Sequence, residues 1–314
     1  MILKQKKVVI TGAAGLVGQN LVLYLRSQGY QNIIAIDKHQ TNLSILKKIN
    51  PEITIVHADL SEQGEWGKYV EQANIVILLH AQITGLLAED FIQNNLQATE
   101  NVLAIIKRHP NIYIIHVSSS VINTAANDLY TITKRQQEQM VLNSGVTFCL
   151  LRPTLMFGWF DQKHLGWISR FMEKTPFFPI PGHGQYIRQP LYSRDFCKIL
   201  SMVIEKKPIN AIYDIVGQEK ITYIDIIKLI KRTKSLKTII VKIPYCLFYG
   251  LLKCYPLIGS KPPFTAAQLT ALTAGDCFTG IDTNIIFGVS PTTLSQAIQE
   301  TFTHPIYSKI VLER

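Results

Sequence analysis

A glycine-rich turn between an apolar strand and a helix constrains the fold of this chain most. Residues 7–10 read KVVI, a short β-branched run, and TGAAGLVG follows directly at 11–18. Residues 16–27 then have the apolar spacing of a helix. Glycines so spaced permit a tight turn, and the helix N-terminus offers free N–H groups to phosphates. The motif therefore predicts a dinucleotide-binding turn, formed by Gly12, Ala14, Gly15, Leu16, Val17 and Gly18.

A carboxylate about 20 residues after the turn is the second signal for a dinucleotide. Asp37 ends the apolar run IIAID, the second predicted strand. A carboxylate there accepts hydrogen bonds from both ribose hydroxyls and repels a 2′-phosphate. Lys38 and His39 follow and soften that rejection, and Lys38 is a further expected cofactor contact. The sequence therefore favours NAD over NADP as the cofactor.

Strand and helix patterns alternate through the first half of the chain, which predicts crossover units and a parallel sheet covered on both faces. Further strands are expected at 32–36, 54–57, 74–79, 112–117 and 146–151, and helices at 94–108 and 130–142. The expected fold is α/β, a doubly wound parallel (Rossmann) sheet. We expect an NAD-binding domain over 1–155 and a smaller substrate-binding lobe over 156–314, interleaved with the end of the sheet.

The pattern is looser after Arg152, which is itself expected to form a buried ion pair. The Pro- and Gly-rich residues 176–190 predict a loop, and Asp195 is expected to cap the helix that follows. The remaining elements are helices at 195–205, 223–234 and 290–301, the last capped by Ser290, and a strand at 211–216.

Composition narrows the class of protein. Hydrophobic residues make up 47% of the 314 residues and charged residues 17%, as in a globular chain. No uninterrupted apolar run reaches the length of a spanning helix. The net charge of +10 favours an anionic partner, but zinc-finger and aromatic RNA-binding patterns are absent, so nucleic acid is not expected. The five scattered cysteines indicate reduced thiols in the cytoplasm and no metal site.

Further segments follow the glycine turn in a recognisable order: HADL at 57–60, VILLHAQITG at 76–85, NLQATENVL at 95–103, HVSSS at 116–120, LYTITK at 129–134, LLRPTLMFG at 150–158 and GHGQYIRQPLYSRDF at 182–196. Over almost its whole length the chain thus resembles the extended short-chain dehydrogenase/reductase family. That family includes nucleotide-sugar epimerases and dehydratases and 3β-hydroxysteroid dehydrogenases. The resemblance implies Asp59 at the adenine amine and further cofactor contacts from Leu60, Leu79, His80, Ala81, Asn95 and Pro153.

Tyr130 and Lys134 are four residues apart and share one face of a predicted helix. An ammonium beside a phenol favours the phenolate, so we expect a lowered tyrosine pKa and a base for a hydroxyl proton. The resemblance gives the pair this role and has both contact the cofactor, with the lysine at the nicotinamide ribose. It also implies a serine that orients the substrate oxygen, which is Ser119, or Ser120 if the register slides by one.

Two departures from the family pattern leave alternatives open. Only a short segment separates Ser119 from Tyr130, and His80 stands where alanine is usual. His80 either touches the nicotinamide or substrate, or packs with a single hydrogen bond. Arg188 either meets the substrate diphosphate or forms a surface ion pair, and Tyr192 either contacts substrate or packs.

The favoured interpretation is an NAD-dependent enzyme acting on a hydroxyl of a nucleotide sugar, by epimerisation or dehydrogenation. No Asp-Glu pair follows the serines, as it does in dehydratases. A steroid-like alcohol is the first alternative substrate. The second alternative is a non-catalytic dinucleotide-binding subunit, because residues 243–259 and the following KPPFTAAQLTALTAGD resemble the 39 kDa subunit of complex I. We expect residues 243–259 to pack in a core rather than lie in a membrane interface, and the protein to form a homodimer.

Overall fold

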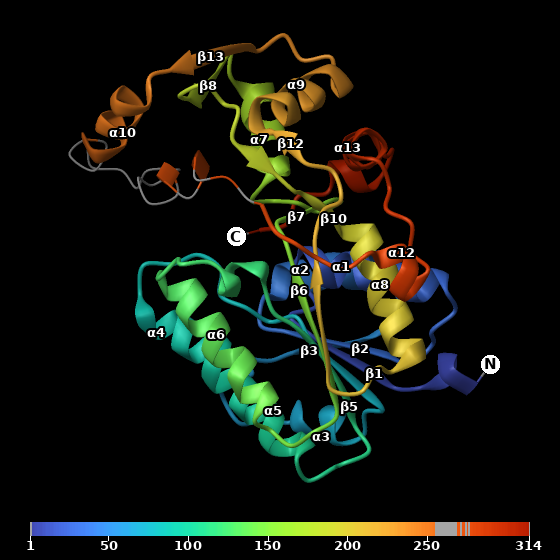
Figure 1. The fold of residues 1–314 in the computed structure, drawn as a ribbon. Coiled ribbons are helices and arrows are strands. Elements are labelled where there is room, and N and C mark those ends of the chain that lie inside the picture. Colours follow the sequence, from blue (N-terminus) through green and yellow to red (C-terminus); the bar gives the residue numbers. More distant parts are fainter. Residues whose placement is uncertain (1, 255–268, 271, 274, 276, 314) are drawn as a thin grey trace.

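A seven-stranded sheet, parallel throughout, lies at the centre of the protein in the computed structural model (Figure 1), which describes residues 2–254, 269–270, 272–273, 275 and 277–313. Its order is β11-β6-β5-β4-β1-β2-β3. The chain adds β2 and β3 on one side of β1, and then adds β4, β5, β6 and β11 on the other side. Ligands bind at the carboxyl ends of the strands beside such a reversal. The strands are β1 (Val8–Thr11), β2 (Ile33–Asp37), β3 (Thr54–His57), β4 (Ile75–Leu78), β5 (Tyr113–Val117), β6 (Phe148–Pro153) and β11 (Ala211–Ile215).

Helices cover both faces of the sheet, which explains why its strands are apolar without alternation. One face, to which Ile10 and Ile115 contribute, packs against α1 (Leu16–Ser27), α2 (Gln40–Ile49), α8 (Ser193–Lys206) and α12 (Thr283–Phe287) (Figure 1). The other face, to which Val9 and Ile114 contribute, packs against α3 (Gly67–Glu71), α5 (Ala98–Ile106) and α6 (Leu129–Leu142). A short helix, α4 (Ala88–Phe91), and a π-helical segment, Ile92–Gln97, lead into α5.

A smaller lobe lies beyond the carboxyl ends of the strands (Figure 1). It has its own apolar core, to which Phe178, Ile227 and Ile298 belong. Its helices are α7 (Leu165–Lys174), α9 (Tyr223–Thr233), α10 (Tyr245–Cys254) and α13 (Leu294–Thr303). Its strands form three pairs: β7 (Met156–Phe157) with β10 (Leu191–Tyr192), β9 (Ile187–Arg188) with β12 (Ile221–Thr222), and β8 (Phe177–Pro181) with β13 (Ile239–Ile243).

The strands and helices expected in the first half are confirmed, whereas the loop and the two helix caps expected in the second half are wrong. Residues 176–190 contain β8 and β9, because β8 pairs on one side only and an edge strand tolerates proline. The last helix begins at Leu294, and Thr293 caps it by accepting from the Gln296 amide. Ser290 instead donates to Asn284. Asp195 lies inside the first turn of α8, where its carboxylate accepts from Thr292.

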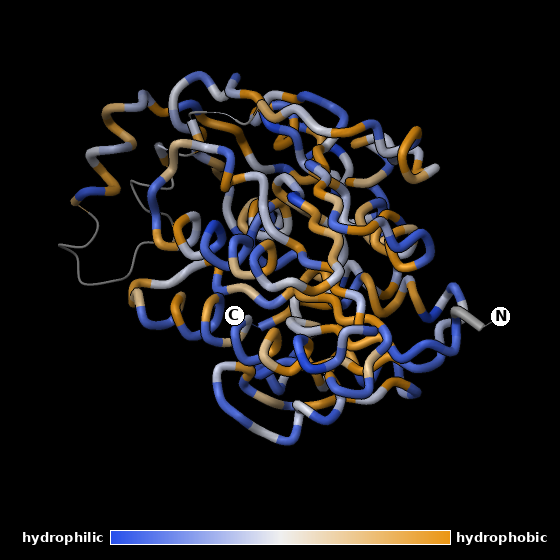
Figure 2. The backbone as a smooth tube through the Cα atoms, turned by 60° about the horizontal axis from the view of Figure 1, so that its bottom comes forward, coloured by the Kyte–Doolittle hydropathy of each residue, from blue (hydrophilic) through white to orange (hydrophobic). Residues whose placement is uncertain are grey.

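Apolar segments concentrate along the central strands, and one apolar helix projects from the lobe (Figure 2). That helix, α10, has no buried residue, and Leu247 and Leu251 are 56% and 57% exposed. The expectation that residues 243–259 pack in a core is therefore wrong for α10, while 255–259 and most of KPPFTAAQLTALTAGD lie outside the described residues. Among the described helices, none has the length and apolar character needed to cross a membrane.

Candidate active site

The glycine turn has the geometry that a dinucleotide phosphate requires. Gly12 has a φ of +67°, and a Cβ there would lie 2.5 Å from the backbone nitrogen of His80. A Cβ on Gly18 would lie 2.4 Å from the Ala13 carbonyl oxygen. Gly15 precedes α1 and supplies no side-chain cap to the helix. The turn therefore keeps its backbone accessible and directs the N-terminus of α1 at the site that a pyrophosphate would occupy.

Asp37 lies at the carboxyl end of β2, directly beside the glycine turn. Its carboxylate accepts hydrogen bonds from the backbone nitrogens of Ala14 and His39, each at 2.9 Å. Burial raises the pKa of Asp37, and these backbone hydrogen bonds act in the opposite direction. The carboxylate thus supports the turn from the position at which the sequence predicts contact with the ribose.

Lys38 is held by an ion pair with a second predicted cofactor residue. Its Nζ lies 2.9 Å from Asp59 Oδ2 and also donates to Asn94. Burial raises the pKa of Asp59, but hydrogen bonds from Ser61 and Lys38 outweigh it and hold the pKa below its usual value. The positive charge of Lys38, which was expected to soften rejection of a 2′-phosphate, is therefore partly neutralised.

The remaining predicted cofactor residues follow the strands of the same sheet edge. Leu79 follows β4 and donates its backbone N–H to Thr11 at 3.1 Å, and Pro153 ends β6. Asn95 is fully buried, accepts from the Gln82 backbone nitrogen at 2.6 Å and donates to Thr133 Oγ1 at 2.9 Å. Asn95 therefore fixes the segment after β4 against α6. Leu60 is buried, while His80 and Ala81 are half-buried.

The parallel sheet and α6 bring Ser119, Tyr130 and Lys134 to this edge. Ser119 follows β5, and Tyr130 lies in the first turn of α6, which Asp128 caps by accepting from the Thr131 amide at 3.0 Å. The side chains of Ser119 and Tyr130 lie close enough for the Ser119 hydroxyl to act on the pKa of the Tyr130 phenol. Ser120 is itself buried and instead begins a 3-10 turn over Ser120–Asn123.

Lys134 is 1% exposed and lies one turn beyond Tyr130 on α6. Its Nζ donates to the Val117 carbonyl at 3.0 Å and to Gln137 Oε1 at 2.5 Å. Burial lowers the pKa of Lys134 to about 7, and the charge of Glu138 acts against this. The ammonium is thus buried at the end of β5.

The expected lowering of the tyrosine pKa is not found. Burial raises the pKa of Tyr130 above its usual value, and the neighbouring Ser119 hydroxyl opposes this only in part. The reason is that the Lys134 ammonium is directed at Val117 and Gln137, while desolvation disfavours the phenolate.

The short connection between Ser119 and Tyr130 is held by a residue that the sequence did not single out. Arg135 donates from Nε to the Ile122 carbonyl at 3.0 Å and from Nη2 to the Thr124 carbonyl. These bonds tie the loop to α6. The signal was weak, because an arginine next to Lys134 is typical of a solvated helix face.

His80 makes two hydrogen bonds, where the packing interpretation expected one. Its Nδ1 lies 2.7 Å from Thr11 Oγ1, and its Nε2 lies 2.9 Å from Thr99 Oγ1. Gln137 donates to the same Thr99 oxygen at 2.8 Å. Sequence analysis missed Thr11, Thr99 and Gln137 here, although Gln137 is three residues after Lys134 and therefore on its face of the helix.

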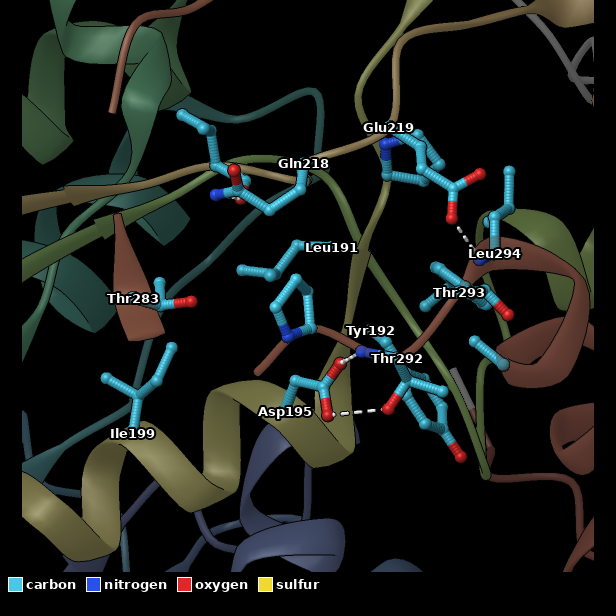
Figure 3. Close-up of a pocket in the computed structure, with 16 residues that line it drawn as sticks. Leu191, Tyr192, Asp195, Ile199, Gln218, Glu219, Thr283, Thr292, Thr293 and Leu294 are labelled. Carbon is cyan, nitrogen blue, oxygen red and sulfur yellow. Dashed lines mark hydrogen bonds between the residues drawn. The ribbon is translucent and has the colours of Figure 1, made fainter. Parts of the chain in front are cut away.

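The two predicted substrate residues of the lobe lie on separate elements. Arg188, on β9, donates to the Leu272 carbonyl at 2.8 Å. Tyr192 is buried on β10, with its ring 5.6 Å from that of Phe157. Tyr192 also lines a cavity of about 180 Å³ between α8 and α13, in which Asp195 binds Thr292 (Figure 3). None of Ser119, Tyr130 and Lys134 lines this cavity, and substrate contact by Tyr192 stays a prediction.

The expected ion pair of Arg152 is confirmed behind the site. Arg152 on β6 donates to both carboxylate oxygens of Glu138 on α6, with the shortest distance 2.5 Å. Asp214 on β11 lies 3.7 Å from the same guanidinium. The pair links α6 to the sheet one turn beyond Lys134, and thereby fixes the helix that carries Tyr130.

Comparison with known proteins places the fold and the family. The chain is 27% identical over 247 residues to a trifunctional UDP-glucose 4,6-dehydratase/UDP-4-keto-6-deoxy-D-glucose 3,5-epimerase/UDP-4-keto-L-rhamnose-reductase of Arabidopsis thaliana. The match covers 68% of this chain and 37% of that protein, so the chain spans well under half the length of this relative. It is 25% identical to the low-salt glycan biosynthesis protein Agl12 of Haloferax volcanii, over 66% of this chain and 76% of that one.

Solved structures show the same fold. The UDP-glucuronic acid 4-epimerase from Bacillus cereus, in complex with NAD, superposes with a TM-score of 0.73 at 19% identity, over 95% of this chain and 96% of that one. The dTDP-glucose 4,6-dehydratase from Bacillus anthracis, also in complex with NAD, gives 0.75 at 18% identity over the same shares. Residues 8–215 match the NAD dependent epimerase/dehydratase family, in agreement with the expected cofactor. With the Rossmann sheet and glycine turn described above, this match shows that the chain belongs to the NAD dependent epimerase/dehydratase family.

Proposed function

We propose that this protein oxidises a hydroxyl group of a nucleotide sugar through Ser119, Tyr130 and Lys134. The observation that carries the proposal is the proximity of the Ser119 and Tyr130 side chains, with Lys134 buried one helical turn further on. These groups lie at the carboxyl ends of the strands, along the edge where Gly12 and Asp37 would hold the dinucleotide. The named relatives are enzymes of UDP-glucose, UDP-glucuronic acid and dTDP-glucose, which favours a nucleotide sugar as the substrate.

Each side chain has one task in the proposed reaction. Tyr130 Oη takes the proton of the substrate hydroxyl, and the Ser119 hydroxyl orients the substrate oxygen and acts to lower the pKa of the phenol. Lys134 places a positive charge beside the nicotinamide ribose. The chemistry that bound NAD supplies is acceptance of the hydride from the substrate carbon. The Asn95 and Arg135 contacts keep the loop and α6 in register during this step.

The segment after the serines favours oxidation followed by return of hydride, or oxidation alone, over dehydration. No Asp-Glu pair follows the serines at 118–120, whereas the dehydratases that the chain resembles carry one. No carboxylic acid is therefore offered at that position to protonate a leaving hydroxyl. Arg188 is half-buried and is proposed to contact the substrate diphosphate, for which a planar guanidinium is suited.

Incubation with NAD and a panel of UDP- and dTDP-sugars tests the proposal. We expect a new sugar product by chromatography, or accumulation of reduced nicotinamide, and the loss of either in Tyr130→Phe. A matched control is Tyr69→Phe, because Tyr69 lies on α3, away from the sheet edge that carries the site. Equal turnover by wild type and Tyr130→Phe contradicts the assigned role of Tyr130.

Assembly and location are proposed on separate grounds. A homodimer through α6 and the helix beside it would bury Leu129 and Ile92, which are 37% and 45% exposed. The five cysteines are free thiols, which fits a reducing cytoplasm. Light scattering on the purified protein tests the dimer, and a monomer at micromolar concentration contradicts it.

A further inference from the structure

A buried set of polar side chains connects the glycine turn to Lys134. The Lys134 ammonium donates to Gln137 Oε1 at 2.5 Å, and Gln137 Nε2 donates to Thr99 Oγ1 at 2.8 Å. His80 Nε2 lies 2.9 Å from the same threonine oxygen, and His80 Nδ1 lies 2.7 Å from Thr11 Oγ1. Thr11 ends β1 and directly precedes Gly12. The set therefore begins at the cofactor turn and ends at the lysine of the proposed site.

The directions of these hydrogen bonds are fixed by the one proton of each hydroxyl. Thr99 donates to the Asn95 carbonyl at 2.7 Å, so its oxygen accepts from both Gln137 and His80. His80 then carries its proton on Nε2, and the Thr11 hydroxyl donates to His80 Nδ1 at 2.7 Å rather than to the Ile77 carbonyl at 3.3 Å. Burial lowers the pKa of His80 to about 3, in agreement with a neutral ring. Every member of the set is thus satisfied in one arrangement.

This arrangement decides which end of the Gln137 amide faces Lys134. The NH₂ group faces the Thr99 oxygen, and the His80 carbonyl and ring lie 3.4 Å away. The amide oxygen is thereby turned towards the lysine. A flipped amide would place two N–H groups against the ammonium and leave Thr99 without a donor. His80 also cannot shift freely, because its backbone nitrogen lies against Gly12.

We propose that Gln137, oriented by Thr99 and His80, is a positioning residue that holds the Lys134 ammonium in place for the cofactor. The inference rests on the proposed function, since it concerns the lysine of that site. An amide does not carry a proton onward, so the set orients Lys134 and does not act as a proton relay.

The charge of Lys134 depends on its neighbours from every adjacent element. Glu138 on the same helix favours the ammonium, and burial opposes it. Two histidines interact with the Lys134 charge, His80 after β4 and His116 on β5, and burial lowers the pKa of both. The remaining polar groups of this region are Tyr130 on α6 and Arg152 on β6, which is paired with Glu138.

Two substitutions of Gln137 should move the pH dependence in opposite directions. We expect NAD affinity, measured by calorimetry, and kcat to fall as Lys134 loses its proton. Gln137→Met removes the acceptor and should move this fall to lower pH, whereas Gln137→Glu adds a carboxylate and should move it to higher pH, each by about 1 pH unit. Gln137→Met should also lower kcat by about 10- to 100-fold, since the lysine loses its fixed position.

Two controls separate positioning from a general structural effect. Gln136→Met changes the exposed neighbour on the same helix and should leave the midpoint unchanged. His80→Ala removes the support behind Gln137 and should move the midpoint in the same direction as Gln137→Met, by a smaller amount. Thermal denaturation of each variant identifies any that do not fold, and the other variants then carry the test.

The outcomes distinguish this inference from the proposed function. Opposite shifts for Gln137→Met and Gln137→Glu support the positioning role. Unchanged midpoints, or shifts in one direction for both variants, overturn it. If the wild type turns over no nucleotide sugar but the NAD-binding midpoints still shift in opposite directions, the proposed reaction fails while the positioning role stands.

Discussion

Gly12→Ala is expected to destabilise the protein and to weaken NAD binding, for two separable reasons. The first is the backbone, because φ at Gly12 is +67°, in the left-handed region that favours glycine. The second is space, because the new Cβ would lie 2.5 Å from the His80 nitrogen and 2.7 Å from the Leu79 carbonyl carbon. Both neighbours are backbone atoms beside β4, so they cannot rotate away as a flexible side chain would.

The structure provides a matched control that isolates the two costs. Gly145 has a similar φ of +74°, but a Cβ there meets no atom within 4 Å. A left-handed conformation costs a residue with a Cβ about 1–2 kcal/mol, so Gly145→Ala should lose about that much stability. Overpacking adds about 1–3 kcal/mol, so Gly12→Ala should lose about 2–5 kcal/mol in total.

Urea denaturation and NAD calorimetry on the two variants test this reasoning. Gly12→Ala should be the less stable variant and should bind NAD at least about tenfold more weakly, because 1.4 kcal/mol of lost contact already gives a factor of about ten. Gly145→Ala should bind NAD as the wild type does. Equal stability of the two variants, with equal NAD affinity, would refute the argument that the close approach of His80 requires glycine.

Three further predictions concern the sheet edge and α6. Asp37→Ala should reduce the preference for NAD over NADP, because the carboxylate that repels a 2′-phosphate is lost. The dissociation constants of NAD and NADP, measured for the wild type and the variant, check this. The same ratio of the two constants in both proteins would contradict it. Glu138→Gln should lower the free energy of unfolding, measured by urea denaturation, by about 3–5 kcal/mol, because the Arg152 guanidinium loses its buried carboxylate partner. A decrease below about 1 kcal/mol would mean that water replaces the partner. Burial lowers the pKa of Lys134 from 10.5 to about 7, so between these pH values the unfolded chain binds more protons than the folded protein. Lys134 therefore makes the free energy of unfolding rise with pH over this range. Lys134→Met should flatten that rise, and identical pH profiles of stability for the two proteins would contradict the burial argument.

The first half of the fold was predictable because its glycine turn and its apolar runs indicate the same architecture. The turn at Gly12 and the apolar strands such as β4 leave one plausible architecture, a parallel sheet covered on both faces. The second half was harder for a physical reason. Strands β8 and β9 are short, pair on one side only and carry prolines or few apolar residues, so they look like a loop in the sequence. The start of α13 depends on a long-range bond from Thr292 to Asp195.

The residues of the candidate site were predictable where they belong to a local sequence motif. Tyr130 and Lys134 share a helix face, and their neighbourhood follows from the spacing. The partners of Lys134 were not predictable, because Gln137 acquires its orientation from Thr99 and His80, which lie on other elements. The direction of the Tyr130 pKa also depends on burial, which no spacing rule reports.

The most direct test of the central claim is a single-turnover experiment with NAD-loaded protein and an excess of one nucleotide sugar. The absorbance of reduced nicotinamide is followed in the wild type, in Tyr130→Phe and in Ser119→Ala. If Tyr130 takes the hydroxyl proton and Ser119 orients the oxygen, the wild type forms reduced nicotinamide and both variants form it at least about a hundredfold more slowly. Formation at the same rate in Tyr130→Phe, with the same sugar product, would contradict the account.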